Sequence, residues 1–530
     1  MNMHKTGNFG AFAIVALVVL GVATSFAGPG GTTSSSIAPA TMARAGTIDD
    51  RFQSYNIEMV EVTGGRFWKP YASKGGAKPS DANQPAGMDP SLYEYRTPIN
   101  LSNSRLRKLA AALGPAYVRV SGTWANSTYF QNSDDPAPAT APAGFKGVLT
   151  RQQWKGVVDF AHAAHAQIST SFAIGAGTRD ASGVWTPVQA QQILAYTKSI
   201  GGSIAAAEFM NEPTIPEIGG APKGYDAAAF GRDFAVFRAF AKQASPAMLI
   251  VGPGGVGEGT GLNGSMHMIA SDAILSTTGP VFDVFSYHSY AAVSSRCAAM
   301  GASARTTTSE AALSEEWLAR PEHIEEFYGS LRDHYEPGKP LWLTETAQAA
   351  CGGDRWASTF LDTFRYLNQL GALARRGVQV HMHNTLAASD YGLIDEKTYE
   401  PRPNYWAALL WRRLMGTTVL DPGPSLAPNL HLYAHCLRNH PGGVALLAIN
   451  ADRAEEESVD LPIQSERYTL TAQDLLDNRV QLNGSDLKLG ADDALPDFKG
   501  AATRSGKVTL APASITFLSL PNAHNANCQQ

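Results

Sequence analysis

Two glutamates follow short apolar runs of the kind that form buried strands. Glu345 comes directly after residues 341–344, and Glu212 lies within Asn211-Glu212-Pro213, after the mostly apolar residues 204–210. A buried carboxylate is unfavourable unless it is paired or has a chemical role. For either residue alone, an acidic strand end bound to a nearby arginine would be a sufficient explanation. A pair at the ends of parallel strands suits glycoside hydrolysis, in which one carboxyl group protonates the leaving oxygen and the other attacks the anomeric carbon.

Asn211 and Pro213 add to this pattern. The Asn211 amide can hold the sugar hydroxyl next to the anomeric carbon, and Pro213 restricts the turn behind Glu212. The interval between Glu212 and Glu345 is what three strand–helix units and their loops would occupy in an eightfold barrel. We therefore expect the two carboxylates to meet across a sugar-sized gap.

The elements around these residues alternate between strand and helix eight times from residue 52 to residue 415. This alternation predicts an α/β fold, an eightfold (β/α) TIM barrel. After Gly416, short alternating segments between turn residues predict a C-terminal antiparallel β-sandwich. The helical region 309–335 is expected to break near Pro321. His381 and His383 share one face of the last barrel strand, where packing into the barrel interior or substrate contact is favoured over metal binding.

The first residues have the pattern of a targeting segment. Lys5 precedes an apolar stretch, residues 11–22, and small residues follow up to Ala27. This predicts cleavage after Ala27, and the alternative of an uncleaved anchor would have a short apolar core. We expect export to a periplasm or the outside, with no stable membrane insertion after signal removal. The predicted division is a signal peptide (1–27), a flexible leader that could add a strand to the sandwich (28–50), the barrel (51–416) and the sandwich (417–530).

Composition and cysteines fit an exported globular protein. The 530 residues are 44% hydrophobic and 17% charged, and the formal net charge of −5 indicates no field that would attract nucleic acid. Four cysteines in an exported chain suggest two disulfides with three possible connectivities. Their positions along the chain favour one bond between Cys297 and Cys351 in the barrel and one between Cys436 and Cys528 in the C-terminal region.

Several stretches, taken in this order, resemble glycoside hydrolase family 79, the group of heparanase and of microbial and plant β-glucuronidases. The resemblance covers the chain from about Phe52 to its end. It is carried by Pro115-Ala116-Tyr117-Val118-Arg119 with Gly122-Thr123, by Asn211-Glu212-Pro213, by Glu345-Thr346 with Gly352-Gly353, and by Tyr391-Gly392-Leu393-Ile394-Asp395-Glu396 with Pro403-Asn404-Tyr405-Trp406.

This resemblance implies a retaining mechanism with Glu345 as nucleophile and Glu212 as acid/base. The two carboxyl groups should then lie about 5–5.5 Å apart, and the charge of Glu345 is expected to raise the pKa of Glu212. No cofactor and no metal are implied, and a Cys436–Cys528 bridge fits the family. The residues implied to bind substrate are Tyr290 at the nucleophile, Gly352, Gly353 and Tyr391 at the uronate carboxylate, and Glu58 and Thr123 in the same sugar pocket.

The implied substrate is a β-linked glucuronide or a uronate-containing glycan, with exo cleavage slightly favoured over endo cleavage. The loop 131–144 is acidic and rich in Pro and Ala, which disfavours heavily sulfated substrates. The nucleophile loop is one residue longer than the family pattern before its glycines and contains Cys351. Two alternatives remain open: a barrel glycosidase that cleaves a neutral glycoside, and a non-catalytic carbohydrate-binding protein on a degenerate barrel.

Overall fold

A computed structural model describes residues 35–72, 89–259, 268–300 and 306–529. The predicted signal peptide, residues 1–27, lies outside the described residues. Within the described ranges, no helix has both the length and the apolar character that crossing a membrane requires.

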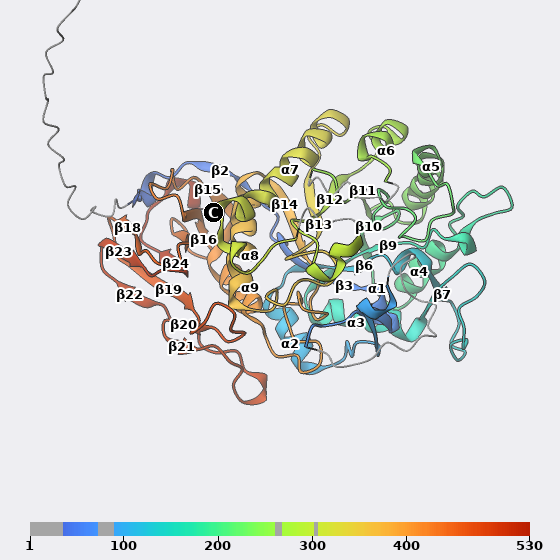
Figure 1. Cartoon of the computed structure of the whole chain (residues 1–530). Coiled ribbons are helices and arrows are strands. Elements are labelled where there is room, and N and C mark those ends of the chain that lie inside the picture. Colours follow the sequence, from blue (N-terminus) through green and yellow to red (C-terminus); the bar gives the residue numbers. More distant parts are fainter. Residues whose placement is uncertain (1–34, 73–88, 260–267, 301–305, 530) are drawn as a thin grey trace, which may run out of the picture.

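Eight parallel strands close into a barrel, and their order around the barrel follows their order along the chain (Figure 1). The closed parallel arrangement confirms the predicted TIM barrel. The strands are β3 (Gln53–Glu58), β6 (Ala116–Ser121), β9 (Ala166–Ser171), β10 (Ile204–Glu208), β11 (Leu249–Gly255), β12 (Val284–Tyr290), β13 (Leu341–Ala347) and β14 (Val378–His383).

Helices follow the barrel strands, and several begin at side-chain caps that the sequence contains. Asn103 accepts a hydrogen bond from the Leu106 amide at the start of α2, and Thr150 forms a capping box with Gln153 at the start of α3. The helices are α1 (Met59–Thr63), α2 (Ser104–Ala112), α3 (Arg151–Ala163), α4 (Val188–Ser199), α5 (Ala227–Ala244), α6 (Ser271–Thr278), α7 (Glu315–Tyr335), α8 (Phe360–Arg375) and α9 (Pro403–Leu414).

The expected break near Pro321 is wrong, because α7 continues through this residue. A proline removes one amide donor from the helix interior. Trp317 and Ile324, on either side of Pro321, are both buried against the rest of the molecule. This packing keeps the helix continuous despite the missing hydrogen bond.

Inside the barrel, side chains form layers, because inward-facing residues lie two apart along each strand. The lower layer is apolar and includes Tyr117, Ala206 and Trp342. Two residues further along each of these strands come Arg119, Glu208 and Thr344. The hydrogen bonds described below join these three residues into a polar layer at the carboxyl ends of the strands.

The expectation that His381 and His383 point into the barrel is wrong. Val380 and Met382, which alternate with them, pack in the barrel interior. Both histidines instead contact the ring of Tyr366 on α8, outside the barrel. Burial is the main cause that lowers the pKa of both imidazoles. They are neutral packing groups between the strand and α8.

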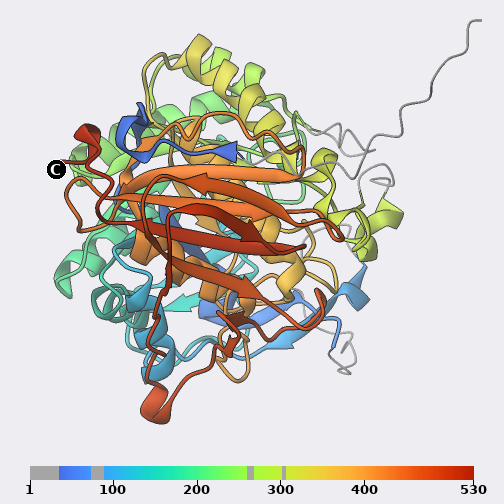
Figure 2. The ribbon, with the colours of Figure 1, turned by 90° about the vertical axis from the view of Figure 1, so that its left-hand side faces the viewer.

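Most of the antiparallel strands after α9 form one large sheet (Figure 2). The strands of the C-terminal part are β15 (Met415–Leu420), β16 (Leu430–Leu437), β17 (Val444–Asn450), β18 (Glu457–Leu461), β19 (Ser465–Thr471), β20 (Gln481–Leu482), β21 (Ser485–Asp486), β22 (Ala501–Thr503), β23 (Gly506–Leu510) and β24 (Ser514–Leu520). A second, smaller sheet contains β18 and β23, and an apolar core that includes Leu446, Val459 and Leu518 lies between the two sheets.

The segment before the barrel adds a strand to each of these sheets. β1 (Ser35–Ser36) pairs with β18, and β2 (Arg44–Thr47) pairs with β15 at the sheet edge. The domain limits at residues 50 and 416 stay a prediction.

Helix α8 lies between the barrel and the large sheet (Figure 1). The Tyr433 hydroxyl on β16 donates to Asn368 of α8 at 2.7 Å. A Cβ at Gly371 would lie 2.3 Å from the Tyr433 ring, so the close contact between helix and sheet requires glycine. The Cys436–Cys528 disulfide joins β16 to the end of the chain, as predicted.

Two small pairs of strands extend the barrel loops. β4 (Gly65–Trp68) and β5 (Tyr93–Arg96) form an antiparallel pair within the long segment 64–96. β7 (Thr128–Gln131) and β8 (Gly147–Thr150) pair in parallel at the two ends of the acidic loop 131–144.

Candidate active site

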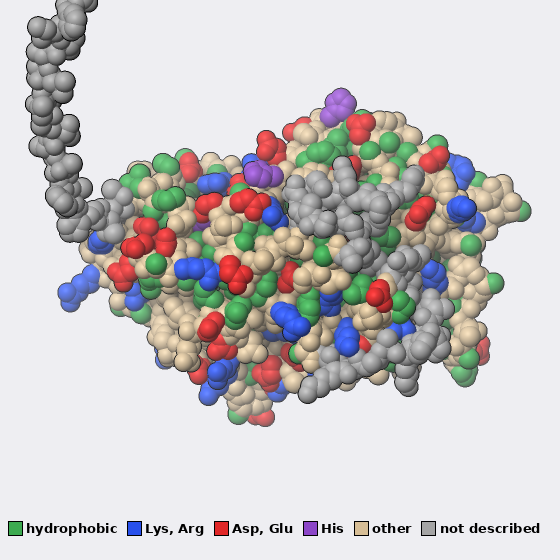
Figure 3. Space-filling view, viewed as in Figure 1, with side chains coloured by type: hydrophobic (Ala, Val, Ile, Leu, Met, Phe, Trp, Pro, Cys, Tyr) green, Lys and Arg blue, Asp and Glu red, His purple; other side chains and the backbone are tan. Residues whose placement is uncertain are grey.

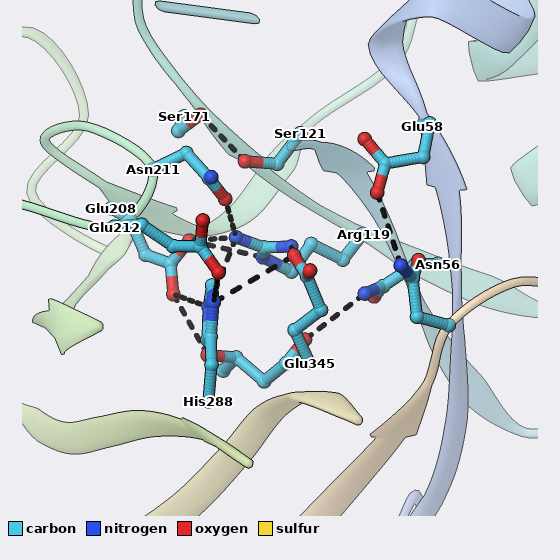
Figure 4. Close-up of polar contacts among 12 residues, drawn as sticks. Asn56, Glu58, Arg119, Ser121, Ser171, Glu208, Asn211, Glu212, His288 and Glu345 are labelled. Carbon is cyan, nitrogen blue, oxygen red and sulfur yellow. Dashed lines mark hydrogen bonds and ion pairs between the residues drawn. The ribbon is translucent and has the colours of Figure 1, made fainter. Parts of the chain in front are cut away.

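Arg119 lies at the centre of the polar layer and is almost completely buried (Figure 4). Its Nη2 donates to Glu208 Oε2 at 2.7 Å, and its Nη1 donates to Glu345 Oε2 at 2.9 Å. Glu208 Oε1 accepts a further bond from the Thr344 hydroxyl at 2.9 Å. Burial opposes the charged guanidinium, but the charges of Glu208 and Glu345 raise the pKa of Arg119 above its ordinary value. Arg119 is therefore a permanent cation between two carboxylates.

A bulge in β13 brings Glu345 to this cation. Leu343 pairs with Tyr287, but the next pairing joins Glu345 to His288, so Thr344 is an extra residue. A bulge of this kind changes the direction of the side chains that follow it. Consecutive residues, Thr344 and Glu345, consequently both reach the polar layer. The Tyr290 hydroxyl donates to Glu345 Oε1 at 2.6 Å, so each oxygen of this carboxylate accepts a hydrogen bond.

Glu212 lies four residues beyond the end of β10, on a backbone with φ of 49°. A side-chain-bearing residue in this left-handed region is strained and has to be held by its surroundings. Asn126 supplies such support: its Nδ2 donates to the Asn211 carbonyl at 2.9 Å, and its Oδ1 accepts from the Asn211 amide at 2.8 Å. The Asn211 side chain is fixed as well, because its Oδ1 accepts from Arg119 Nη2 at 2.8 Å.

Burial raises the pKa of Glu212 to about 7. The positive charge of Arg119 opposes this rise, and the carboxylate of Glu208 contributes to it. The predicted rise of this pKa is present, but the like charge that contributes to it is Glu208 rather than Glu345. Glu345 is itself in contact with Arg119, whose positive charge offsets it.

His288 joins Glu212 to Arg119. Its Nε2 lies 3.3 Å from Arg119 Nη2, and its Nδ1 lies 3.0 Å from Glu212 Oε1. Because a guanidinium can only donate, Nε2 accepts and the ring proton is on Nδ1, which donates to Glu212. Burial lowers the pKa of His288 to about 4, so the ring is neutral at neutral pH.

Asn384 organises the other side of the site. Its Nδ2 lies 2.9 Å from the Tyr290 hydroxyl, 3.2 Å from Glu58 Oε1 and 3.4 Å from the Tyr391 hydroxyl. Burial, with a contribution from the charge of Glu345, raises the pKa of Glu58 well above its ordinary value. A Cβ at Gly122 would lie 1.5 Å from Glu58 Oε2, so this side chain occupies its place because residue 122 is glycine.

Two glycines of the loop that follows β13 lie next to this group. Gly352 and Gly353 have φ of 81° and 80°, and a Cβ on Gly353 would lie 3.3 Å from Tyr391 Cβ. Their carbonyl oxygens accept bonds from Ser389 and Ser294. Within the described residues, neither glycine N–H donates to an acceptor. The predicted disulfide between Cys297 and Cys351 is present directly before these glycines.

The structure thus brings most of the predicted residues to one end of the barrel. Glu212, Glu345 and Asn211 surround Arg119, and Tyr290, Glu58 and Tyr391 surround Asn384. Thr123 is half-buried beside Gly122 and forms no hydrogen bond within the described part of the chain. Its role in the sugar pocket stays a prediction.

The site also contains residues for which no role there was predicted, among them Arg119, Glu208, Asn126 and Asn384. Two of them carried a usable signal, because Arg119 and Glu208 are charged residues within otherwise apolar strand sequences. A buried charge needs a partner of opposite sign, and each is the partner of the other. Asn126 and Asn384 lie in loop sequences without such a contrast.

The atoms of Glu212, His288 and Glu345 that could coordinate a metal ion all lie within 4.8 Å of one another. Arg119 is in contact with both His288 and Glu345, so its guanidinium already provides the positive charge that a metal ion would supply. These residues are therefore better suited to holding protons than to binding a divalent ion. The predicted absence of a metal stays a prediction.

On the face of the molecule shown in Figure 3, acidic and basic side chains are interspersed rather than gathered by sign. A surface of this kind creates no strong field toward polyanions. It agrees with the small formal net charge of −5.

Comparisons with known proteins identify the family. Residues 96–371 match the family model described as "Glycosyl hydrolase family 79, N-terminal domain". Heparanase-like protein 1 of Arabidopsis thaliana is 26% identical over 500 residues, which cover 83% of this chain and 88% of the relative. Baicalin-beta-D-glucuronidase of Scutellaria baicalensis is 33% identical over 189 residues, which cover 34% of this chain and 36% of the relative.

A solved structure has the same overall fold. The 4-O-alpha-L-rhamnosyl-beta-D-glucuronidase of Fusarium oxysporum 12S superposes with a TM-score of 0.62 at 14% identity, covering 92% of this chain and 99% of that one. Together with the family match over half of the chain, the two carboxylates at the carboxyl ends of the barrel strands lead to one conclusion: this chain belongs to glycoside hydrolase family 79 and is a glycosidase.

Proposed function

We propose that this glycosidase cleaves β-linked glucuronic acid from glucuronides or uronate-containing glycans with retention of configuration. The observation that carries the proposal is that carboxylate oxygens of Glu212 and Glu345 lie within 4.8 Å of each other. Inverting enzymes keep their carboxyl groups about 6.5–9.5 Å apart to admit a water molecule, whereas retaining enzymes keep them about 5–5.5 Å apart. The short distance here favours direct attack by one carboxylate.

Glu345 is the proposed nucleophile. Arg119 and Tyr290 each donate a hydrogen bond to one of its oxygens, so both oxygens of the carboxylate are held in place. Burial and the charge of Glu345 raise the pKa of Tyr290 well above its ordinary value, so Tyr290 stays a donor. The two donors also fix the direction from which Glu345 attacks the anomeric carbon.

Glu212 is the proposed acid/base. With a pKa of about 7, it is protonated in the resting enzyme at mildly acidic to neutral pH. His288 donates to Glu212 Oε1, which leaves Oε2 to carry the proton toward the leaving oxygen. After Glu345 has formed the glycosyl–enzyme bond, Glu212 takes a proton from water, and the resulting hydroxide attacks the anomeric carbon and releases Glu345.

Asn211 is placed to bind the hydroxyl beside the anomeric carbon. Its oxygen is occupied by Arg119, so its amide nitrogen is the group that faces the sugar. A hydrogen bond to this hydroxyl strengthens as positive charge develops on the sugar ring in the transition state.

The uronate carboxylate is proposed to bind the N–H groups of Gly352 and Gly353 and the Tyr391 hydroxyl. Backbone amides suit an anionic ligand because they bring partial positive charge and no counter-ion. Glu58 lies beside them, and its pKa is raised well above the ordinary value, which favours the protonated, neutral form. A neutral Glu58 does not repel the ligand. Thr123 is the proposed further contact in this pocket.

Glucuronic acid as the sugar is also suggested by the name of the Scutellaria baicalensis relative, a baicalin-β-D-glucuronidase. We favour exo cleavage over endo cleavage. We also propose that the chain is exported to a periplasm or the outside after removal of residues 1–27, because two disulfides form most readily in an oxidising compartment. The proposed domains are the barrel (51–416) and the sandwich (417–530).

A panel of 4-nitrophenyl glycosides tests the substrate. The β-D-glucuronide should be hydrolysed, with a kcat/KM at least about tenfold above that of the β-D-glucoside, since a charged hydrogen-bond partner is present only in the former. Preference for a neutral glycoside would replace the proposal with the neutral-glycosidase alternative. Product sizing on heparosan oligosaccharides separates exo cleavage, which releases monosaccharides, from endo cleavage, which releases shorter oligosaccharides.

A further inference from the structure

Two loops that leave neighbouring barrel strands are fastened together beside the proposed carboxylate site. One follows β12, which ends with Tyr290, and the other follows β13, which carries Glu345. Beyond the barrel, the Ser294 amide donates to the Ala350 carbonyl at 3.1 Å, and the Ala350 amide donates to the Ala292 carbonyl at 2.9 Å. The Cys297–Cys351 disulfide then joins the two loops covalently.

The backbone at the end of this link is in an unusual conformation. Cys351, Gly352 and Gly353 have φ of 62°, 81° and 80° in succession. Glycine adopts this left-handed region freely, but a residue with a side chain adopts it only when its surroundings hold it there. Cys297 is buried in an apolar cluster that includes Phe67 and Trp124, so it provides a firm anchor for Cys351.

The Gly352 and Gly353 N–H groups, which have no acceptor among the described residues, are held in different ways. A peptide unit is planar, so its carbonyl and its N–H turn together. The Gly353 N–H shares a peptide with the Gly352 carbonyl, which accepts from the Ser389 hydroxyl at 3.1 Å. The Gly352 N–H shares a peptide with the Cys351 carbonyl, which accepts no hydrogen bond within the described residues. This second peptide adjoins Cys351, whose side chain is fixed by the disulfide.

We propose that the Cys297–Cys351 disulfide is a specificity-determining element, which orients the peptide between Cys351 and Gly352 so that its N–H binds the substrate carboxylate. The proposal rests on the proposed glucuronidase function. The disulfide contributes to recognition of the substrate carboxylate and takes no part in the chemistry at the anomeric carbon. Glu212 and Glu345 are held separately by Asn126, Arg119 and Tyr290.

The test compares two disulfide variants. In Cys297→Ala/Cys351→Asn, asparagine tolerates the left-handed backbone at position 351. The matched control, Cys436→Ala/Cys528→Ala, removes the disulfide of the sandwich. KM and kcat are measured for 4-nitrophenyl β-D-glucuronide and β-D-glucoside, and Tm is measured by circular dichroism.

We expect the first variant to raise KM for the glucuronide about tenfold, which corresponds to the loss of one hydrogen bond to a charged group. The value of kcat should change less than about threefold. The preference for glucuronide over glucoside should fall by the factor by which KM rises. The control should lower Tm and leave the preference unchanged. An unchanged preference in a folded first variant would overturn the proposal, whether activity on both substrates is retained or is lost to the same extent.

Reduction provides a second route if the first variant does not fold. In the control variant, Cys297–Cys351 is the one remaining disulfide, because the chain has four cysteines. Dithiothreitol should raise its KM for the glucuronide, and reoxidation should restore it. An unchanged KM after complete reduction, verified by mass spectrometry of alkylated Cys351, would contradict the proposal. Failure of the unaltered enzyme to prefer glucuronide over glucoside would instead overturn the proposed function.

Discussion

Two buried arginines in this chain have contrasting surroundings. Arg119 lies in the barrel mouth and Arg365 lies on α8, between the barrel and the sandwich, and each is 1% exposed. Arg365 binds Asp362 through two bonds of 2.6 and 2.8 Å and Gln369 through one of 2.7 Å, all within the same helix. Arg119 binds residues that come from separate strands and loops of the barrel.

The two networks also differ in their access to solvent. The side chains of Arg365 and Asp362 are each 1% exposed. In the network of Arg119, the side chains of Glu345 and Glu212 are 7% and 10% exposed. A polar network that is sealed from solvent stabilises the fold, whereas a network that is open on one side can reach a ligand. The comparison separates the structural charge cluster from the proposed active site.

The largest expected effect comes from the two carboxylates of the open network. Glu345→Ala should lower kcat for 4-nitrophenyl β-D-glucuronide on the order of 10⁴-fold or more, because no nucleophile remains. Glu212→Gln should lower it by about 10²–10⁴-fold, the usual contribution of an acid/base group. Both variants should retain the circular dichroism spectrum of the unaltered chain. Substantial activity in Glu345→Ala would show that another residue is the nucleophile.

The comparison of the arginines is tested by Arg119→Met and Arg365→Met. Each leaves a buried carboxylate without its cation, so both should lower the free energy of unfolding by about 3–5 kcal/mol. Arg119→Met should also lower kcat by about 10²-fold, because Glu345 loses one of its two donors. Folded Arg365→Met should keep the kcat and KM of the unaltered chain. The distinction would be wrong if both variants lost activity to the same extent.

A smaller effect is expected from a hydroxyl at the proposed carboxylate site. Tyr391→Phe should raise KM for the glucuronide about tenfold and leave hydrolysis of the glucoside unchanged, because it removes one donor to the carboxylate. Tyr366→Phe is the matched control, since its hydroxyl accepts from Gln53 outside the barrel interior. Steady-state kinetics on both substrates distinguish the two variants. An equal change in KM for both substrates in Tyr391→Phe would argue against a contact with the carboxylate.

The smallest effect concerns pH. Because the proposed acid, Glu212, acts in its protonated form, kcat/KM should fall as pH rises through about 7, the pKa that burial gives this group. The folded chain holds this proton more tightly than the unfolded chain does. The resulting stabilisation is present below pH 4.5, the ordinary value, and is lost as pH rises through about 7.

Glu212→Gln removes this dependence. From pH 5 to pH 8, the variant should therefore become more stable relative to the unaltered chain, by about 3 kcal/mol at most, since one pKa unit corresponds to about 1.4 kcal/mol. Urea unfolding at several pH values measures the difference. A difference that stays constant across this range would mean that the pKa of Glu212 is not raised.

Much of this architecture could be predicted from the sequence. The alternation of apolar strand runs and amphipathic helices predicted the barrel, because each element must bury one face. Asn211-Glu212-Pro213 and the strand before Glu345 predicted which carboxylates lie together. The segment that carries Gly352, Gly353 and Tyr391 was found through the family resemblance.

Other features depend on tertiary structure and left no local signal. The bulge at Thr344 decides where Glu345 points, and it arises from pairing with a strand that lies far away in sequence. Asn384 has no distinctive neighbours in the sequence, yet it contacts three side chains of the site. The direction of His381 and His383 was wrongly predicted because alternation along a strand gives two faces and does not say which one is inside.

The central claim is that Glu345 attacks the sugar, and covalent trapping tests it most directly. The protein is incubated with a glucuronate-configured cyclophellitol aziridine, digested and mapped by mass spectrometry. The account predicts one label per chain, on Glu345, and no label in Glu345→Ala. A label on another residue, or glucuronide turnover without any labelling and with the α-anomer as first product, would contradict it.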